Sequence, residues 1–539
     1  MSARNGIVLL LALSTLSLLV ACGGYSSPKV VPPPSGGFSN SSLNGTYVFS
    51  STGVDSSINV AFLTVAGDFV ANGSGSITGG AIDVADAVSG VTPNNAITSG
   101  SYHVGVDGRG QATLNTAAGS IILDFVLTSS SHGLVTEFDG NGTGSGTLDL
   151  QPTAVAQTAV TGLTFSLSGV GATAPFATVG TITLSSTGSV TAGVEDFNNG
   201  GTPTTSQAVS TSSFVIVGTG TAPGTAQLIT NVGTFGFDVY AIDSTHVKFI
   251  ENDSTGFFLS GDGYAPGTAL PASATLAFTM AGIDTSGNPQ ALGGTFPLDA
   301  NSNVSAGGLE DFNDVGIVGQ DSTFAGGFSP ISGGRSVLTL TTFVNGAANA
   351  LTGTYTFAAY PFTSNGLTGI ALLEIDSTVV NGVTQGAALV QTSTSLSASQ
   401  GYGLNLSAIN IPGGNFAAPF EEDDIAEFVT NGSSFTGIVD INDEGSLSFD
   451  QSFSSSAYNP PDSSGRGTAS TIAHGNTFVS YDFYVVDGST CLLLETDGNQ
   501  IGVGVFEQQS TPGSAGSARP AISMFRPVIS PHGALRRKQ

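Results

Sequence analysis

Residues 47–53 run Tyr-Val-Phe-Ser-Ser-Thr-Gly, and three later segments of the 539-residue chain repeat this pattern. The other segments are 163–169, 276–282 and 402–408. Each has apolar residues at its first and third positions and a small residue at its seventh. Alternation with a period of two indicates a β-strand with one buried face. The sequence therefore predicts four copies of one β-unit.

Further blocks follow each opening strand in the same order, which makes a chance likeness a poor explanation. A Gly-x-x-Asp block ends at Asp83, Asp196, Asp311 and Asp440. A Glu-x-Asp block begins at Glu137, Glu251, Glu374 and Glu495. Three copies close with a glycine followed five residues later by Gln151, Gln391 or Gln509.

The blocks divide the chain into four tandem units, each of a size usual for a domain. We expect β-domains at 41–152, 161–264, 274–391 and 402–509, separated by linkers rich in Ala, Ser, Thr and Pro. Within a unit, turn signals separate about eight short strands, and no window has a helical period. The predicted fold class is all-β: four antiparallel domains, as up-and-down barrels or alternatively as β-sandwiches. We expect the four domains to be separate modules in a row, with no β-sheet shared between copies.

The N-terminus has the features of an export signal. Arg4 precedes an apolar run, Ile7–Val20, that is too short to span a bilayer and ends before Cys22. Leu19-Val20-Ala21-Cys22 resembles the lipobox of bacterial lipoproteins. That resemblance implies removal of residues 1–21, lipidation of Cys22 and anchoring to the cell envelope. Gly23 rather than Asp after the cysteine implies the outer membrane.

Two further resemblances bear on the whole chain. Gly45-Thr46-Tyr47 is loosely similar to the lipocalin Gly-x-Trp motif, which implies a barrel able to enclose a ligand. The glycine-rich repeats resemble those of uncharacterised bacterial lipoproteins, a likeness that implies no activity. Residues 22–40, which contain three consecutive prolines, are predicted to form a flexible tether.

Charge is distributed very unevenly. All 39 acidic residues lie between the tether and residue 510, where the only Lys and Arg residues are Arg109, Lys248, Arg335 and Arg466. Such a negative surface repels phosphate backbones and argues against a nucleic-acid partner. Residues 510–539 carry only basic charges and are predicted to be a disordered tail. The tail suits contact with anionic headgroups, envelope polysaccharide or the acidic domains themselves.

The bases and acids recur together, which suggests structural ion pairs within each copy. Asp482 precedes Glu495 across a turn, so we expect the two to lie opposite each other in a hairpin. A nearby arginine can neutralise such a pair. The candidate pairs are Arg109 with Asp124 and Glu137, Arg335 with Glu374, and Arg466 with Asp482 and Glu495. The third copy has Pro361 at the place expected for the aspartate, and the second has Lys248 instead of the arginine.

Calcium is the alternative explanation for these acids, because hard oxygen ligands suit it. The candidate ligands are Asp311, Asn313, Asp314, Asp482, Glu495 and Asp497. No segment matches an EF-hand loop, and no other cofactor is expected. The acidic run 421–424 is predicted to be a solvated loop.

No catalytic motif is present, so we expect no enzyme and assign no catalytic residue. Cys491 lies in an apolar run and is predicted to be a buried hydrophobic residue. The leading hypothesis is a lipid-anchored envelope protein whose β-domains act as a surface spacer or as binding and adhesion modules, with a polysaccharide or protein partner. The alternative is a lipocalin-like carrier of small apolar ligands. The third hypothesis is an enzyme that acts on envelope glycans, which would need a cleft lined by carboxylates absent from the other copies.

Overall fold

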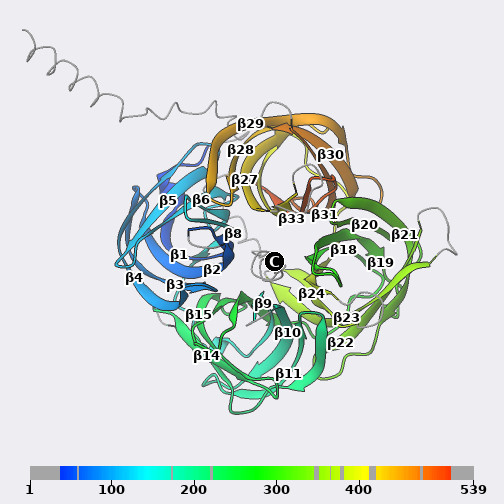
Figure 1. The fold of residues 1–539 in the computed structure, drawn as a ribbon, viewed down its shortest axis with the longest axis horizontal. Helices are drawn as coiled ribbons and strands as arrows, with labels where there is room; N and C mark the ends of the chain where they lie inside the picture. Colours follow the sequence, from blue (N-terminus) through cyan, green and yellow to red (C-terminus); the bar gives the residue numbers. More distant parts are fainter. Residues whose placement is uncertain are drawn as a thin grey trace, which may run out of the picture. The chain divides into compact units, whose positions relative to one another are not determined.

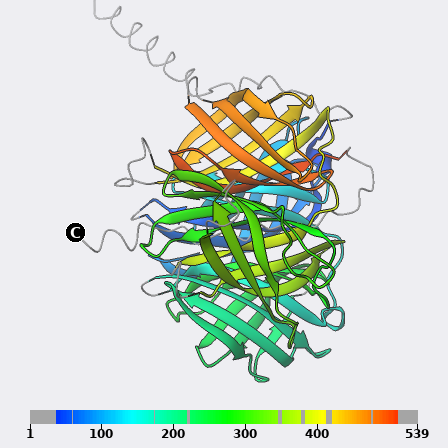
Figure 2. The ribbon, with the colours of Figure 1, turned by 90° about the vertical axis from the view of Figure 1, so that its right-hand side faces the viewer.

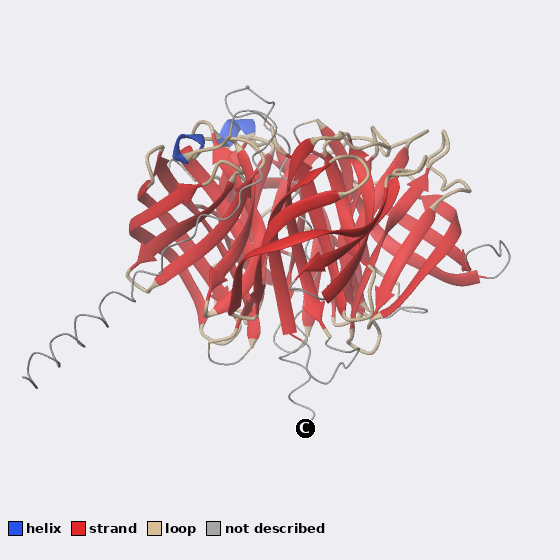
Figure 3. Ribbon diagram, turned by 90° about the horizontal axis from the view of Figure 1, so that it is seen from above, coloured by secondary structure: helices blue, strands red, loops and turns tan. Residues whose placement is uncertain are grey.

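The computed structural model describes residues 37–510, except 58–59, 172–173, 219–221, 345–350, 365, 377–381, 412–419 and 474–476. The signal peptide, Cys22, most of the tether and the basic tail lie outside this range. Strands are nearly all of the regular structure (Figure 3), with two short 3₁₀-helices, η1 (Asn40–Ser42) and η2 (Gln157–Ala159). Within the described ranges, no helix has the length and hydropathy that a membrane crossing requires.

The strands form four rings in which each strand pairs with the next and the last pairs with the first; Figure 1 shows them in sequence colours. The first ring comprises β1 (Asn44–Asp55), β2 (Ala61–Asn72), β3 (Ser76–Asp86), β4 (Gly90–Val104), β5 (Arg109–Thr116), β6 (Ser120–Leu127), β7 (His132–Asp139) and β8 (Gly142–Gln151). The fourth comprises β26 (Gln400–Asn410), β27 (Phe420–Thr430), β28 (Phe435–Asp443), β29 (Ser446–Asn459), β30 (Arg466–Ala473), β31 (Thr477–Asp487), β32 (Thr490–Glu495) and β33 (Gln500–Gln508). Both are separate closed barrels, so the barrel prediction is confirmed for these two copies and the sandwich alternative is wrong there.

The second and third rings belong to one larger sheet. The second ring comprises β9 (Gly162–Val170), β10 (Pro175–Leu184), β11 (Val190–Asn199), β12 (Thr202–Ala208), β13 (Phe214–Ile216), β14 (Gly224–Ile229), β15 (Thr234–Asp243), β16 (His246–Glu251) and β17 (Phe258–Pro266). The third comprises β18 (Thr275–Ile283), β19 (Pro289–Pro297), β20 (Leu309–Asp314), β21 (Ile317–Phe328), β22 (Ser336–Val344), β23 (Leu351–Ser364), β24 (Leu367–Glu374) and β25 (Val383–Val390). β17 closes the second ring against β9, and β25 closes the third against β18.

The expectation that no sheet is shared between copies is wrong at one point. Ala265 and Pro266, at the end of β17, pair with Thr363 and Phe362 of β23 in the third ring. β17 extends beyond its own ring at this end, which leaves its last two residues free to pair with the neighbour. This short ladder joins the second and third rings.

The repeated Gly-x-x-Asp block forms one half of an interface between successive rings. In each ring its aspartate accepts hydrogen bonds from the next ring. Asp83 accepts from Tyr240 at 2.7 Å, Asp196 from Arg335 at 2.6 and 2.8 Å, Asp311 from Arg466 at 2.6 and 2.9 Å, and Asp440 from Arg109 at 3.0 Å. The last contact runs from the fourth ring back to the first.

Two more repeated residues contact the next ring in the same direction. An asparagine two residues after the aspartate donates to the backbone carbonyl of the Glu-x-Asp glutamate: Asn198 to Glu374 at 2.9 Å, Asn313 to Glu495 at 3.1 Å, and Asn442 to Glu137 at 2.8 Å. The first ring has Ala85 at this position. The closing glutamines also donate across, Gln391 to Val485 at 2.7 Å and Gln509 to Leu127 at 3.0 Å.

These contacts form a head-to-tail cycle in which the fourth ring closes onto the first. When one interface is repeated with a rotation that closes, the subunits form a cyclic assembly. Here one chain supplies all four strand rings of the cycle. Apolar residues fill the junctions as well, for example Val126 and Leu134 against Ile425 and Val505. Figure 2 shows the rings from the side, with the strands tilted as closed barrels require. The described residues accordingly belong to one compact unit, a closure that the repeats did not predict.

Burial extends into the segment predicted to be the tether. Phe38 is 2% exposed and belongs to the apolar core of the first ring. Its amide donates to the Val106 carbonyl at 3.0 Å. The packed chain therefore begins before residue 41.

Candidate functional site

The acidic run 421–424 lies within β27 and is mostly buried, so the prediction of a solvated loop is wrong. The side chains alternate between two environments, as a strand requires. Asp423 faces the first ring and accepts a hydrogen bond from Thr143 at 2.8 Å and another from Ser145. Glu422 and Asp424 face the lumen of the fourth ring.

That lumen contains a cavity of about 670 Å³. Aromatic side chains line one half of it: Phe428, Phe435, Phe453, Tyr458, Phe483 and Phe506. They contact one another, with ring centroids 5.6 Å apart for Phe428 and Phe435 and 6.1 Å apart for Tyr458 and Phe483. A wall of this kind binds the apolar body of a small molecule.

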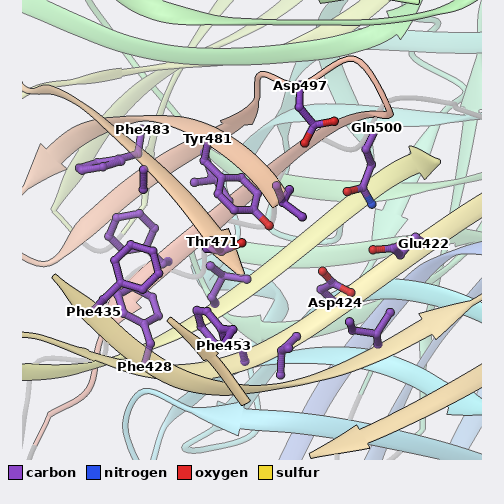
Figure 4. Close-up of a pocket in the computed structure, with 18 of the residues that line it drawn as sticks. Glu422, Asp424, Phe428, Phe435, Phe453, Thr471, Tyr481, Phe483, Asp497 and Gln500 are labelled. Carbon is purple, nitrogen blue, oxygen red and sulfur yellow. The ribbon is translucent and has the colours of Figure 1, made fainter. Parts of the chain in front are cut away.

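Carboxyl groups gather in the other half. Figure 4 shows Glu422, Asp424 and Gln500 across the pocket from Phe428 and Phe435, with Tyr481 between the two groups. Asp443 and Asp497 also line this half. Glu495 pairs directly opposite Tyr481 across the β31–β32 ladder, so both project from the inner face. The cavity is therefore amphipathic.

Burial dominates the titration of these groups. Desolvation, followed by Asp443, raises the pKa of Glu422 to about 8. Desolvation and the neighbouring carboxyls also raise the pKa values of Asp424 and Glu495 well above the ordinary range. Desolvation is also the main cause of the raised pKa values of Asp443 and Asp497. All five pKa values shift upward, but the hydrogen bond between Glu422 and Asp443 raises the pKa of Glu422 and lowers that of Asp443.

The acidic pair on β27 is peculiar to the fourth ring. The fifth residue of the repeated strand pattern pairs with a different residue type in each ring. The pairs are Ser51 with Val65, Leu167 with Thr178, Met280 with Leu292, and Leu406 with Asp424. The seventh residue, which is small in every copy, pairs in the same way with different residues. The pairs are Gly53 with Leu63, Gly169 with Phe176, Gly282 with Gln290, and Ala408 with Glu422. The repeats therefore conserve the strand but have carboxyls at these two positions in the fourth ring only. Comparing the copies position by position could have found this signal in the sequence.

The predicted ion pairs connect different partners from those expected. Arg109 contacts Asp440 and Asp450 of the fourth ring, at 3.0 and 2.9 Å, besides Asp107 of its own turn. Arg335 contacts Asp196 of the second ring at 2.6 Å. The prediction that each arginine forks onto its own copy is wrong for Arg335. Arg109 keeps one partner in its own copy, Asp107, but is not bonded to the predicted Asp124 or Glu137. Both turns lie at ring junctions.

Arg466 has a partner in each of two rings. It lies 2.6 Å from Asp311 of the third ring and 2.7 Å from Asp482 of its own. Tyr484 also donates to Asp311, at 2.6 Å. Asp482 pairs opposite Leu494 rather than Glu495, so the predicted register is wrong by one residue. The observed register places the two acids on opposite faces.

The other predicted acids have no arginine bonded to them among the described residues. Asp124 accepts from Gln111 at 2.8 Å. Glu137 is buried, and Glu374 accepts from Thr384. In the third ring Glu374 pairs opposite Phe357, so the equivalent of the missing aspartate is Ala358 and not Pro361. The β23–β24 ladder is longer than that of β31–β32, since it continues from Glu374 to Leu367, and this displaced the residue count.

The calcium candidates are divided between two places. Asp311 is bonded to Arg466, and the amide of Asn313 donates to backbone carbonyls of the fourth ring. Asp314 is half-buried near Asp284, while Glu495 and Asp497 belong to the lumen group. Within the described ranges, no group of three or more His, Cys, Asp or Glu side chains is placed to hold a metal ion. Cys491 is buried, as predicted.

The rings and the lumen together define a β-barrel protein with an internal cavity of ligand size. No protein-family model matches the chain, and no curated protein matches its sequence. Among solved structures, a transferrin binding protein B double mutant from Haemophilus parasuis is 9% identical, with 89% of this chain and 78% of that chain covered and a TM-score of 0.20. Intact Ap-TbpB, with N and C lobes, is 8% identical over 70% and 84% of the two chains, with a TM-score of 0.19. Likenesses at such TM-scores establish neither a fold nor a function for this chain.

Proposed function

We propose that this chain is a lipid-anchored envelope protein that binds a small molecule in the lumen of the fourth ring. The observation that carries the proposal is the aromatic-lined cavity of about 670 Å³. Its volume lies within the range of about 300–1,000 Å³ found for small-molecule sites. Among the sequence-based hypotheses, a carrier requires such a lumen and a spacer does not.

Filling the lumen should abolish binding. Ala469 lines the cavity from β30, whereas Ala457 is exposed on β29 of the same ring. We expect the chain from Gly23 onward, which keeps the compact unit, to bind one molecule of an environment-sensitive apolar dye, measured by fluorescence titration. Ala469→Trp should weaken dye binding at least about tenfold through steric exclusion, and Ala457→Trp should not change it. Equal dye affinity in the parent and Ala469→Trp, or no binding by the parent, would contradict the proposal.

Anchoring is tested separately. Replacing Cys22 with serine removes the thiol that lipidation requires, and a chain without acyl groups has no stable hold on a bilayer. We expect the parent to sediment with membranes and Cys22→Ser to leave the membrane pellet, as followed by immunoblotting of fractions. A variant that still sediments with membranes would exclude the lipoprotein interpretation.

A further inference from the structure

Among the described residues, no Lys or Arg side chain lies beside the lumen carboxyls. The only Lys and Arg residues between 37 and 510 are Arg109, Lys248, Arg335 and Arg466. Each forms a salt bridge with an aspartate outside the lumen group, Lys248 with Asp262 at 3.1 Å for example. The lumen carboxyls therefore have no counter-charge from Lys or Arg of the described residues.

Some of these carboxyl oxygens also have no hydrogen-bond donor. Asp424 lines the cavity and is 7% exposed, and its Oδ1 atom has no partner. Glu495 is 0% exposed, and neither of its carboxyl oxygens has one. Buried polar atoms are almost always hydrogen-bonded, so the Oδ1 atom of Asp424, which lines the cavity, points to a donor that occupies it.

Resting on the proposed function, we propose that the ligand is an amphiphilic organic cation. Its protonated amine is bound by Asp424 and Glu422, and its apolar body lies along the aromatic half. An ammonium supplies three donors and a positive charge, which matches what the carboxyls lack. A metal ion fits less well, because no cluster of the described side chains is placed to ligate one and an ion would leave the aromatic wall uncovered.

Shared protons are the competing way to neutralise this group. The raised pKa values of Glu422 and Asp424 favour their protonated forms when the lumen is empty. The groups around them are Asp443 from β28, Tyr481 from β31, Glu495 and Asp497 from β32 and its turn, and Asp423 and Asp440 on the outer faces. A bound ammonium favours the ionised carboxylate, so it must displace protons. Its affinity should therefore rise with pH up to about 8.

The test compares decylamine with decanol, which share one apolar tail, as competitors of the fluorescent dye. We expect the amine to bind at least about 100-fold more tightly than the alcohol at pH 8, because charge-assisted hydrogen bonds are strong. Amine affinity should rise up to about tenfold per pH unit from pH 6 towards 8, and alcohol affinity should stay flat. Glu422→Gln and Asp424→Asn should each weaken amine binding at least about tenfold and leave alcohol binding unchanged.

Asp462→Asn is the control for a general charge effect, since Asp462 is exposed in the β29–β30 loop of the same ring. Equal amine and alcohol affinities in the parent would overturn the proposal while the lumen site stands. An amine preference that survives both lumen substitutions would also overturn it, because the cation would then bind elsewhere. Failure of both probes and of the dye would reject the lumen site as well. If the variants do not fold, the proposal is tested in the parent alone. Amine affinity that does not rise from pH 6 towards 8 relative to alcohol affinity would then overturn it.

Discussion

Replacing Arg109 with leucine is expected to lower the free energy of unfolding by about 3–5 kcal/mol. The guanidinium is almost fully buried and contacts Asp107, Asp440 and Asp450. Its removal leaves buried carboxylates without a counter-charge, which costs far more than the net value of the ion pair. We would measure denaturant unfolding at pH 8.

The matched control is Asp450→Asn, which removes the most exposed of the three partners, with a side chain 31% exposed. It should change stability by no more than about 1 kcal/mol. Because Arg109 joins β5 to the fourth ring, hydrogen exchange should quicken both in β5 and in β28 of the Arg109→Leu variant. A loss of protection confined to the first ring would show that the contact does not close the cycle.

Stability is expected to fall by several kcal/mol between pH 5 and pH 8. Desolvation raises many buried carboxyl pKa values. Those of Asp68, Asp83 and Asp482 rise to about 7, and those of Glu195, Glu251, Glu310, Glu374, Glu422 and Glu427 to about 8. An acid with a raised pKa in the folded state favours folding while it is protonated. Its contribution is complete below the unfolded pKa near 4 and is lost as pH rises through 7 to 8, at about 1.4 kcal/mol per pKa unit.

Other shifted groups do not reverse this trend. Burial opposes the charge of His132, but Glu507 and Asp149 raise its pKa from 6.5 to about 10, so its contribution is complete below the ordinary value and is lost as pH rises from there through about 10. The pKa of Asp149 is lowered, chiefly by His132 against the effect of burial, and its contribution is lost only in more acidic solution. The contribution of Asp149 therefore changes below the window from pH 5 to pH 8. Within the window, His132 acts in the same direction as the carboxyls, because its stabilising contribution also falls as pH rises.

A single substitution isolates one carboxyl. Glu195 is fully buried, and its Oε1 atom accepts from Thr178 at 2.6 Å. Glu195→Gln replaces the protonated acid with a neutral group of the same shape. We expect it to match the parent at pH 5 and to be more stable at pH 8, with Tm measured by calorimetry at both values. A parent that is more stable at pH 8 than at pH 5 would contradict the prediction.

Part of the site could be predicted and part could not. The alternation that predicted the opening strand at 402–408 also applies to β27, where it places Glu422 and Asp424 on one face. Four consecutive acids are usually solvated, which is why this run is predicted to be a loop. Only the closed ring shows that one face is a lumen and the other the junction with the first ring. The predicted register of the β31–β32 hairpin is also wrong, because an irregularity between Val485 and Asp487 shifts the pairing of Asp482 by one residue.

The sequence alone determined that the chain is built of strands in four related units, because the period of two and the order of the blocks are local properties that each copy repeats. Tertiary structure decided what the repeated charges contact. The Gly-x-x-Asp acids and the turn arginines are far apart in sequence, such as Asp440 and Arg109, and only the closure of the cycle brings them within 3.0 Å. Pairing within a copy and pairing across a junction need the same residue types, so composition and spacing could not distinguish them.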